Sequence, residues 1–255
     1  MTSPAAAQQK PALTPAMRWG TVWLLCFGMI IAYVDRANLS VALASKDFIG
    51  TFNLTDPDRG LLNAVFFWTY AVLQIPAGML VDKFGVKKPY AMFFLSWCVI
   101  SAVTATAGSM WQLISIRLLL GIGESLVTPA SLRWIRYNIP EKSRGLAMGI
   151  YMAGTKYGPA IGAPAAAILI ERYGWRAMFA ILGLGGLIWL LPWQLMVRDD
   201  DRELEKAARK ANAQPTQPFS EVMRNPMLWA VLLGTYCYNY FTFFSMTWLP
   251  AYFAE

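Results

Sequence analysis

Histidine is absent from this sequence of 255 residues, and cysteine occurs only three times. Without histidine, the chain lacks the commonest metal ligand and the side chain that most often exchanges protons near neutral pH. Cys26, Cys98 and Cys237 fall within long apolar segments and show no CxxC or other metal-ligand spacing, which is typical of small buried side chains. We therefore expect no metal site and no cofactor, and any proton transfer would depend on carboxylates. No nucleophile–base pattern is present either, so an enzyme is not expected.

Charged residues are also scarce. They make up 15% of the chain, whereas hydrophobic residues make up 56% and the mean hydropathy is +0.40. Soluble domains ordinarily carry about 25% charged residues. Seven apolar segments reach the length of about 20 residues that a helix needs to cross a bilayer. They lie near residues 19–44, 60–81, 89–108, 111–133, 145–170, 175–197 and 227–253. The sequence predicts an all-α membrane protein, because backbone groups in lipid must satisfy one another within helices.

The net charge of +7 is distributed unevenly over the predicted loops. With the N-terminus inside, fifteen Lys and Arg residues lie in inner segments and only four lie in outer loops. This bias predicts a cytoplasmic N-terminus in a cell (inner or plasma) membrane, and it gives no support to a nucleic-acid partner. A cleaved signal peptide is the rival interpretation of the first segment, but Asp35 and Arg36 interrupt that segment before the candidate cleavage site at residues 42–44.

The polar segments divide the chain into parts. Residues 1–16, rich in Ala, Pro and Gln, are predicted to be a disordered cytoplasmic tail, and the Asp-Pro-Asp sequence after Thr55 predicts a helix start. Residues 17–197 would form a six-helix bundle, residues 198–226 a charged cytoplasmic linker, and residues 227–255 the first helix of an incomplete second domain. Because a seventh span without partners is physically awkward, we expect a longer protein whose missing C-terminal half acts in cis.

Five charged side chains lie inside the predicted spans: Asp35, Arg36, Arg117, Glu124 and Lys156. A charge in mid-membrane costs roughly 2.5 to 3.5 kcal/mol on insertion scales, so such residues usually face a polar cavity and pair there. Arg117 and Glu124 share one helical face, so a purely structural pair is one interpretation of them. Lys156 lies within a glycine-rich stretch and, buried among those glycines, would need Glu124, Asp35 or a ligand carboxylate as its partner. Together these charges predict proton-coupled movement of a small anion.

A glycine- and lysine-rich turn joins the second and third spans. Its sequence at residues 78–88, GMLVDKFGVKK, resembles motif A of the major facilitator superfamily. Glycines permit a tight turn, and Asp82 can accept hydrogen bonds from basic groups or from a neighbouring helix N-terminus. The resemblance implies a gating role for Gly78, Asp82, Gly85, Lys87 and Lys88.

Other segments resemble the same superfamily. Residues 117–124 resemble its motif B, RxxxGxG, and residues 154–162 resemble its motif C, although glycine at every fourth position is also typical of close helix packing. Motif C is often associated with antiporters, so it leaves the direction of transport open. Residues 33–42, YVDRANLSVA, resemble the anion:cation symporter branch, as do residues 68–76 and 238–250.

This resemblance implies a major-facilitator-type six-helix N-terminal bundle plus a seventh transmembrane helix, which is a truncated 12-helix transporter. Members of the branch import organic anions, typically sugar acids and other carboxylates, with protons or sodium. Carried over residue by residue, the resemblance implies proton coupling by Asp35 and Glu124, substrate binding by Arg36, Tyr70, Thr155 and Lys156, and a supporting ion pair by Arg117.

We expect protonation of the carboxylates to free the cations for an organic anion, and loss of those protons to restore the internal ion pairs and expel it. The partners would be that small anion, protons and the lipid bilayer. A sugar or drug transporter of the same superfamily is the alternative, and it would depend little on Arg36. A seven-helix receptor is a remote alternative, because it would normally place its N-terminus outside. The identity of the anion, proton or sodium coupling, and symport or exchange all stay open from the sequence.

Overall fold

The computed structural model describes residues 13–198 and 219–254, and within them it contains helices and no strand. This confirms the all-α fold class. The chain divides into two compact units, Met1–Ala208 and Arg209–Glu255. The predicted tail at residues 1–16 and linker at residues 198–226 lie largely outside the described residues.

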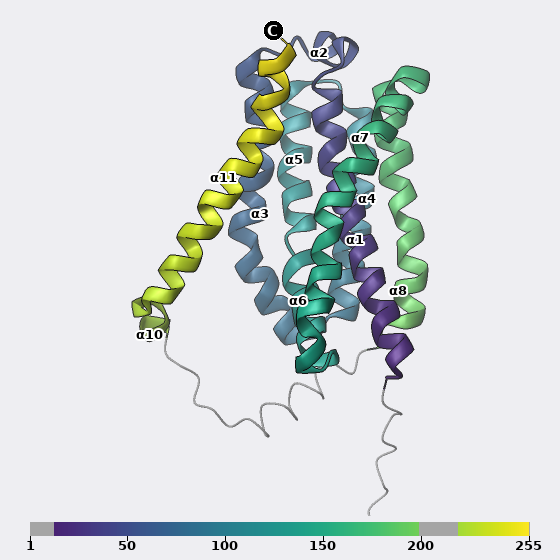
Figure 1. Ribbon diagram of the computed structural model, residues 1–255. Helices are drawn as coiled ribbons and strands as arrows, with labels where there is room; N and C mark the ends of the chain where they lie inside the picture. The colour runs from purple at the N-terminus through teal and green to yellow at the C-terminus, as the bar shows by residue number, and fades with distance from the viewer. Residues whose placement is uncertain (1–12, 199–218, 255) are drawn as a thin grey trace, which may run out of the picture. The chain divides into compact units, whose positions relative to one another are not determined.

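The first unit is a bundle whose long helices run side by side (Figure 1). Five of its stretches are long and apolar enough to cross a membrane: Pro15–Ala42, Asp56–Phe84, Lys87–Thr106, Met110–Asn138 and Glu141–Met196. They cover the first six predicted spans. The elements are α1 (Pro15–Ala42), α2 (Lys46–Phe52), α3 (Asp56–Phe84), α4 (Lys87–Val103), η1 (Thr104–Thr106), α5 (Met110–Glu124), α6 (Val127–Asn138), α7 (Glu141–Gly185), η2 (Gly186–Trp189) and α8 (Leu190–Met196).

The last of these stretches contains two of the predicted spans. Within α7, Gly174 has φ 79° and ψ 165°, which lie far from helical values. The chain turns sharply at this glycine, so α7 consists of two helices, and the second continues through η2 into α8 (Figure 1). The predicted separation of residues 145–170 from residues 175–197 therefore corresponds to a real break in the helix.

Helix α3 begins where the sequence predicts a helix start. The backbone nitrogen and the hydroxyl of Thr55 both donate to Oδ2 of Asp58, at 2.9 and 2.6 Å. The Asp58 side chain thereby satisfies a backbone donor at the helix entry, as in a capping box.

The fourth predicted span is interrupted at its middle. Helix α5 ends at Glu124 and α6 starts at Val127, so Glu124 occupies a helix end inside the stretch Met110–Asn138. Pro129 lies in the first turn of α6, where its missing N–H is tolerated, whereas a continuous helix would lose a hydrogen bond there. The irregular turn therefore leaves a charged residue near the middle of this apolar stretch, a position where charges usually belong to a polar site.

Helices α1 and α7 make the most extensive contact in the unit, and glycines bring them together. A Cβ atom at Gly158 would lie 2.4 Å from Cβ of Tyr33, and one at Gly162 would lie 2.9 Å from Cα of Val34. A Cβ at Gly154 would come within 2.8 Å of a backbone oxygen of α1. The fourfold glycine spacing thus serves close helix packing, as its sequence pattern allows.

Helix α5 is held closely on both sides just before Glu124. A Cβ atom at Gly121 would lie 2.1 Å from Oγ1 of Thr69 on α3, whose hydroxyl donates to the carbonyl of Leu118 at 2.9 Å. A Cβ atom at Gly123 would lie 2.9 Å from Cβ of Trp97 on α4. These two contacts fix the part of α5 that carries the buried carboxylate.

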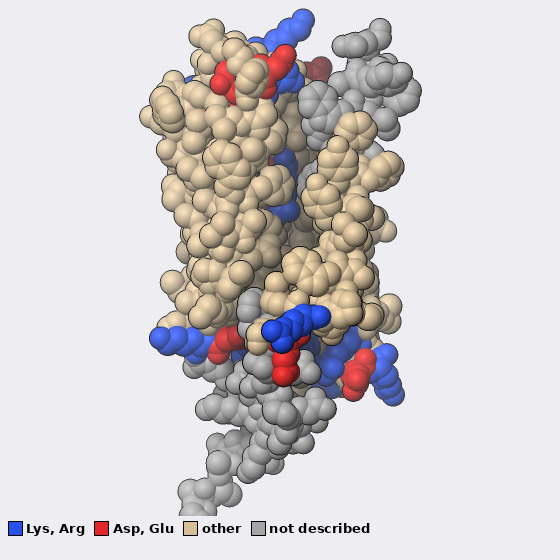
Figure 2. All heavy atoms as spheres, turned by 90° about the vertical axis from the view of Figure 1, so that its left-hand side faces the viewer, with Lys and Arg blue, Asp and Glu red and all other residues tan. Residues whose placement is uncertain are grey.

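Charged side chains gather near the two ends on the face shown in Figure 2, and the band between them is almost uncharged. One end of the first unit, where α1 begins, α3 ends and α6 meets α7, is rich in Lys and Arg. We call it the basic end; its residues include Lys83, Lys87, Lys88, Arg133, Arg136, Lys142 and Arg144.

The second unit contains α10 (Phe219–Arg224) and α11 (Pro226–Ala254). Helix α11 has 29 residues and coincides with the seventh predicted span at residues 227–253. Its length is sufficient to cross a hydrocarbon core of about 30 Å.

Gly85, between α3 and α4, has φ 81° and ψ −179°, a backbone conformation that is essentially restricted to glycine. We expect Gly85→Ala to lower the free energy of unfolding by about 1 to 3 kcal/mol, measured as a lower melting temperature of the detergent-purified protein. Gly145→Ala is the matched control, because Gly145 is helical and a Cβ atom there would meet nothing within 4 Å. Equal melting temperatures for the two variants would contradict the claim that the backbone conformation at position 85 requires glycine.

Candidate functional site

An ion pair between α1 and α5 forms the centre of the candidate site. Arg36 directs both Nε and Nη2 at the same oxygen of Glu124, Oε2, at 3.0 and 2.9 Å. The Glu124 side chain is 1% exposed and the Arg36 side chain 17% exposed. A buried pair of this kind is stabilising only while both partners are present, because either charge alone is strongly unfavourable in a low-dielectric interior.

Aromatic rings enclose the Arg36 guanidinium. Its central carbon lies 4.6 Å from the ring centroid of Tyr33, 4.8 Å from that of Tyr70 and 5.2 Å from that of Phe66. Phe66 and Tyr70, both on α3, are themselves stacked at 5.5 Å. Cation–π contacts of this geometry orient the guanidinium plane and partly replace its hydration. Tyr70 therefore lies beside Arg36, so two of the four residues that the resemblance assigned to substrate binding are in contact.

Arg117 is buried in the same part of the bundle, but it does not form an ion pair with Glu124, which lies on the same face of its helix. Its Nε donates to the carbonyl of Leu62 on α3 at 3.3 Å, and its guanidinium carbon lies 4.8 Å from the Phe66 ring centroid. The direct ion pair of Glu124 is with Arg36. Arg117 contributes its charge to the site at longer range.

Asp35 is the second buried carboxylate, 6% exposed. Its Oδ1 accepts a hydrogen bond from the hydroxyl of Ser101 on α4, which is 1% exposed. Asp35 and Arg36 are neighbours on α1, so their side chains leave the helix in different directions. As a result, Asp35 faces α4, whereas Arg36 faces α3 and α5.

Lys156 and Thr155 are not part of this buried cluster. Lys156 is exposed on the surface of the first unit, and the hydroxyl of Thr155 donates to the carbonyl of Met152 in its own helix at 2.8 Å. The expectation that Lys156 is buried among the glycines of α7 is wrong. Gly154 and Gly158 face α1, and a residue two positions after Gly154 points to the opposite side of the helix.

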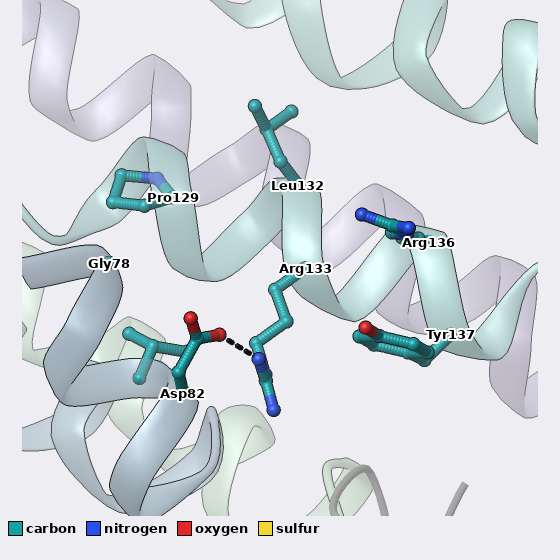
Figure 3. Close-up of a pocket in the computed structure, with 8 residues that line it drawn as sticks. Gly78, Asp82, Pro129, Leu132, Arg133, Arg136 and Tyr137 are labelled. Carbon is teal, nitrogen blue, oxygen red and sulfur yellow. Dashed lines mark hydrogen bonds and ion pairs between the residues drawn. The ribbon is translucent and has the colours of Figure 1, made fainter. Parts of the chain in front are cut away.

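The motif A residues lie together at the basic end. Asp82 accepts a hydrogen bond and ion pair from Nη1 of Arg133 on α6, which gives it the basic partner that the sequence predicts (Figure 3). Lys87 donates to the carbonyl of Gln194 on α8 at 3.0 Å, and Lys88 is exposed. A pocket of about 270 Å³ separates the end of α3 from α6 (Figure 3). It is lined by Gly78, Val81, Asp82, Pro129, Leu132, Arg133, Arg136 and Tyr137.

Two residues of the buried cluster were not predicted from the sequence. Phe66 contacts both buried arginines, and Ser101 binds Asp35. Phe66 is one apolar residue among many in its span, so no sequence signal distinguishes it. Ser101 is a hydroxyl in an apolar segment, but Ser96 in the same helix has the same appearance and is exposed.

Comparison with known proteins identifies relatives over almost the whole chain. It is 33% identical over 247 residues to a probable sulfoacetate transporter of Cupriavidus necator, an alignment that covers 91% of this chain and 56% of that protein. It is 30% identical over 242 residues to a probable L-galactonate transporter of Escherichia coli, covering 90% and 52%. It is 29% identical over 252 residues to a chloroplastic ascorbate transporter of Arabidopsis thaliana, covering 93% and 46%. The chain spans about half the length of these curated relatives.

The fold has a counterpart among solved structures. A bacterial homologue of the human lysosomal transporter Spinster, in an inward-facing and occupied conformation, matches 73% of this chain and 46% of its own chain. The TM-score is 0.65 and the sequence identity 26%. The names of the relatives confirm the resemblance to the organic-anion branch, and residues 25–255 match the sequence profile of the family. The chain is a multi-pass membrane protein that belongs to the Major Facilitator Superfamily.

Proposed function

We propose that this protein takes part in secondary active, proton-coupled import of a small organic anion, such as a sugar acid or another carboxylate or sulfonate. The observation that carries the proposal is the buried pair of Arg36 and Glu124, in which one carboxylate occupies the fork that would bind an anion. Relatives named for sulfoacetate, L-galactonate, ascorbate and hexuronate support this class of substrate. A sugar or drug transporter of the same superfamily would depend little on Arg36.

Competition for Arg36 supplies the coupling. An incoming carboxylate is well shaped for two parallel N–H donors, but Glu124 already uses them. Displacing Glu124 while it is ionised would leave a buried charge without a partner, which is costly. Protonation of Glu124 removes that charge, so the anion and the proton enter the site together. Release of the proton on the other side restores the pair and expels the anion.

Asp35 provides the second exchangeable proton in this proposal. Its carboxylate is buried near Arg117 and Arg36, and its charge adds to that of Glu124 in the same interior. Two ionised carboxylates would repel an approaching anion. Protonation of Asp35 therefore lowers the electrostatic barrier to entry without direct contact with the anion.

The orientation follows from the same charge distribution. With the basic end on the cytoplasmic side, the N-terminus is cytoplasmic and the protein resides in a cell (inner or plasma) membrane. Thr155 is partly buried and Lys156 is exposed on α7, where they would meet the substrate only from outside the buried cluster. The motif A residues at the basic end would control opening on the cytoplasmic side. We propose a transporter and not an enzyme, because the family and the names of the relatives are those of transporters.

An uptake panel tests the proposal. Cells that express the intact gene product would be given labelled sulfoacetate, L-galactonate, glucuronate, ascorbate and, as a neutral control, galactose. We expect accumulation of at least one anion with an inward proton gradient, and its loss after a protonophore is added. Accumulation that persists with the protonophore but requires sodium would show that sodium, and not the proton, is the coupling ion. Uptake of galactose alone would contradict anion transport.

A further inference from the structure

Asp35 and Glu124 lie in one buried site, but different kinds of partner hold them. Glu124 accepts a hydrogen bond from Nε of Arg36 and forms an ion pair with its Nη2. Asp35 instead accepts the neutral hydroxyl of Ser101, and it makes no ion pair with any residue that the structure describes. Ser101 is an uncharged residue that contacts the Asp35 carboxylate directly. A mutation of Ser101 can therefore remove this contact without changing the charge of the site.

The Ser101 hydrogen bond joins two helices. Serine in a helix commonly donates to a carbonyl of the preceding turn, and Ser96 of α4 does so, to Phe93 at 2.8 Å. Ser101, five residues later in the same helix, donates across to α1 instead. Both Ser101 and Asp35 are buried, so water does not readily replace the serine. Its side chain is thus committed to the carboxylate and not to its own helix.

Charged and titratable groups surround Asp35 from three helices of the described chain. They include Arg36 on α1, Arg117 and Glu124 on α5, and Cys98 on α4. Arg36 is engaged by Glu124, and Arg117 donates to a backbone carbonyl of α3. The charged groups act on the Asp35 carboxylate through longer-range electrostatic interactions, whereas Ser101 donates a hydrogen bond to it.

We propose that Ser101 is a positioning residue that sets the pH at which Asp35 exchanges its proton, and this rests on the proton-coupled transport proposed above. A hydroxyl can donate to an ionised carboxylate and accept from a protonated one, so Ser101 can hold Asp35 in both states. A hydrogen bond donated to the ionised form favours that form. Ser101 therefore lets Asp35 release its proton at a lower pH than an apolar neighbour would.

Ser101→Ala tests this directly. The substitution removes the hydroxyl and leaves a side chain that fits the same space. Loss of a donor to the ionised carboxylate keeps Asp35 protonated to higher pH, by about one unit, which is about tenfold in proton affinity. We expect the alkaline limb of the uptake–pH profile to move upward by that amount, measured with whichever anion of the panel is taken up best. Ser96→Ala, an exposed serine of the same helix, is the control and should leave the profile unchanged.

A second measurement separates this inference from the proposed function. The infrared carbonyl band of protonated Asp35, assigned by its loss in Asp35→Asn, would be followed against pH in the purified protein. A parental midpoint in Ser101→Ala, or an equal shift in Ser96→Ala, overturns the inference. A midpoint that moves upward in Ser101→Ala alone supports it. If that midpoint moves but the uptake profile does not, Ser101 still positions Asp35, and it is the coupling role of Asp35 that fails.

Discussion

Arg36→Lys is expected to reduce anion uptake at least about 100-fold at subsaturating substrate. Arg36 directs Nε and Nη2 at one carboxylate oxygen and lies over the rings of Tyr33 and Tyr70. An ammonium keeps the charge but loses the fork and the cation–π contacts of the guanidinium. Hydrogen bonds to charged groups contribute about 1.5–3 kcal/mol and cation–π contacts about 1–2 kcal/mol, and 1.4 kcal/mol is a tenfold change in affinity. The combined loss of these two contributions corresponds to the expected decrease of about 100-fold in uptake.

The measurement is the initial rate of uptake against substrate concentration in cells with matched amounts of protein in the membrane. Arg59→Lys is the control, because Arg59 is a half-exposed arginine with its own partner, Asp56, at 2.9 Å. Surface pairs contribute roughly 0–1 kcal/mol, so this control should transport like the parent. Undiminished uptake by Arg36→Lys would reject the guanidinium as the anion contact.

Glu124→Gln is expected to abolish accumulation against a gradient while exchange of labelled for unlabelled anion continues. A glutamine resembles the protonated acid in size and charge but cannot release a proton. Arg36 would be available to the substrate at every pH, so binding would no longer depend on proton uptake. The pH dependence of uptake between about pH 5 and 8 should become flat for the step that Glu124 controls.

Proteoliposomes provide the measurement, with accumulation under an imposed pH gradient compared with counterflow at equal pH. Glu141→Gln is the control, since Glu141 is exposed at the start of α7. It should accumulate substrate like the parent. Accumulation by Glu124→Gln at the parental level would show that Glu124 is not a coupling group. Loss of both accumulation and counterflow would point to a folding defect, which gel filtration of the purified variant identifies.

The helices were predictable because lipid imposes a length and an apolar composition on them. The sequence located the first six spans, the helix start after Thr55 and the interruption before residue 175. The break between α5 and α6 was missed. Its cause, a proline in the first turn of α6, is visible in the sequence, but a proline alone does not distinguish a kinked helix from a broken one.

The charged residues of the site were also predictable, since charges within spans are rare, but their partners were not. Arg117 and Glu124 share a face seven residues apart, which is about 10.5 Å along the helix axis. The actual partner of Glu124, Arg36, is 88 residues distant. Lys156 was misplaced although it lies two residues after Gly154, and therefore on the side of α7 opposite to the glycines that pack on α1. Pairing of this kind depends on the rotation of each helix about its own axis.

The glycine contact between α1 and α7 limits where the protein can bend. Backbone atoms of the two helices nearly touch at Gly154, Gly158 and Gly162, so neither helix can slide or rotate on the other without a collision. Arg36 and Tyr33, whose ring lies against its guanidinium, are both on α1. In the proposed transport cycle, opening of the site to the anion would therefore come from movement at other helix contacts, with α1 and the first part of α7 moving together as one rigid unit.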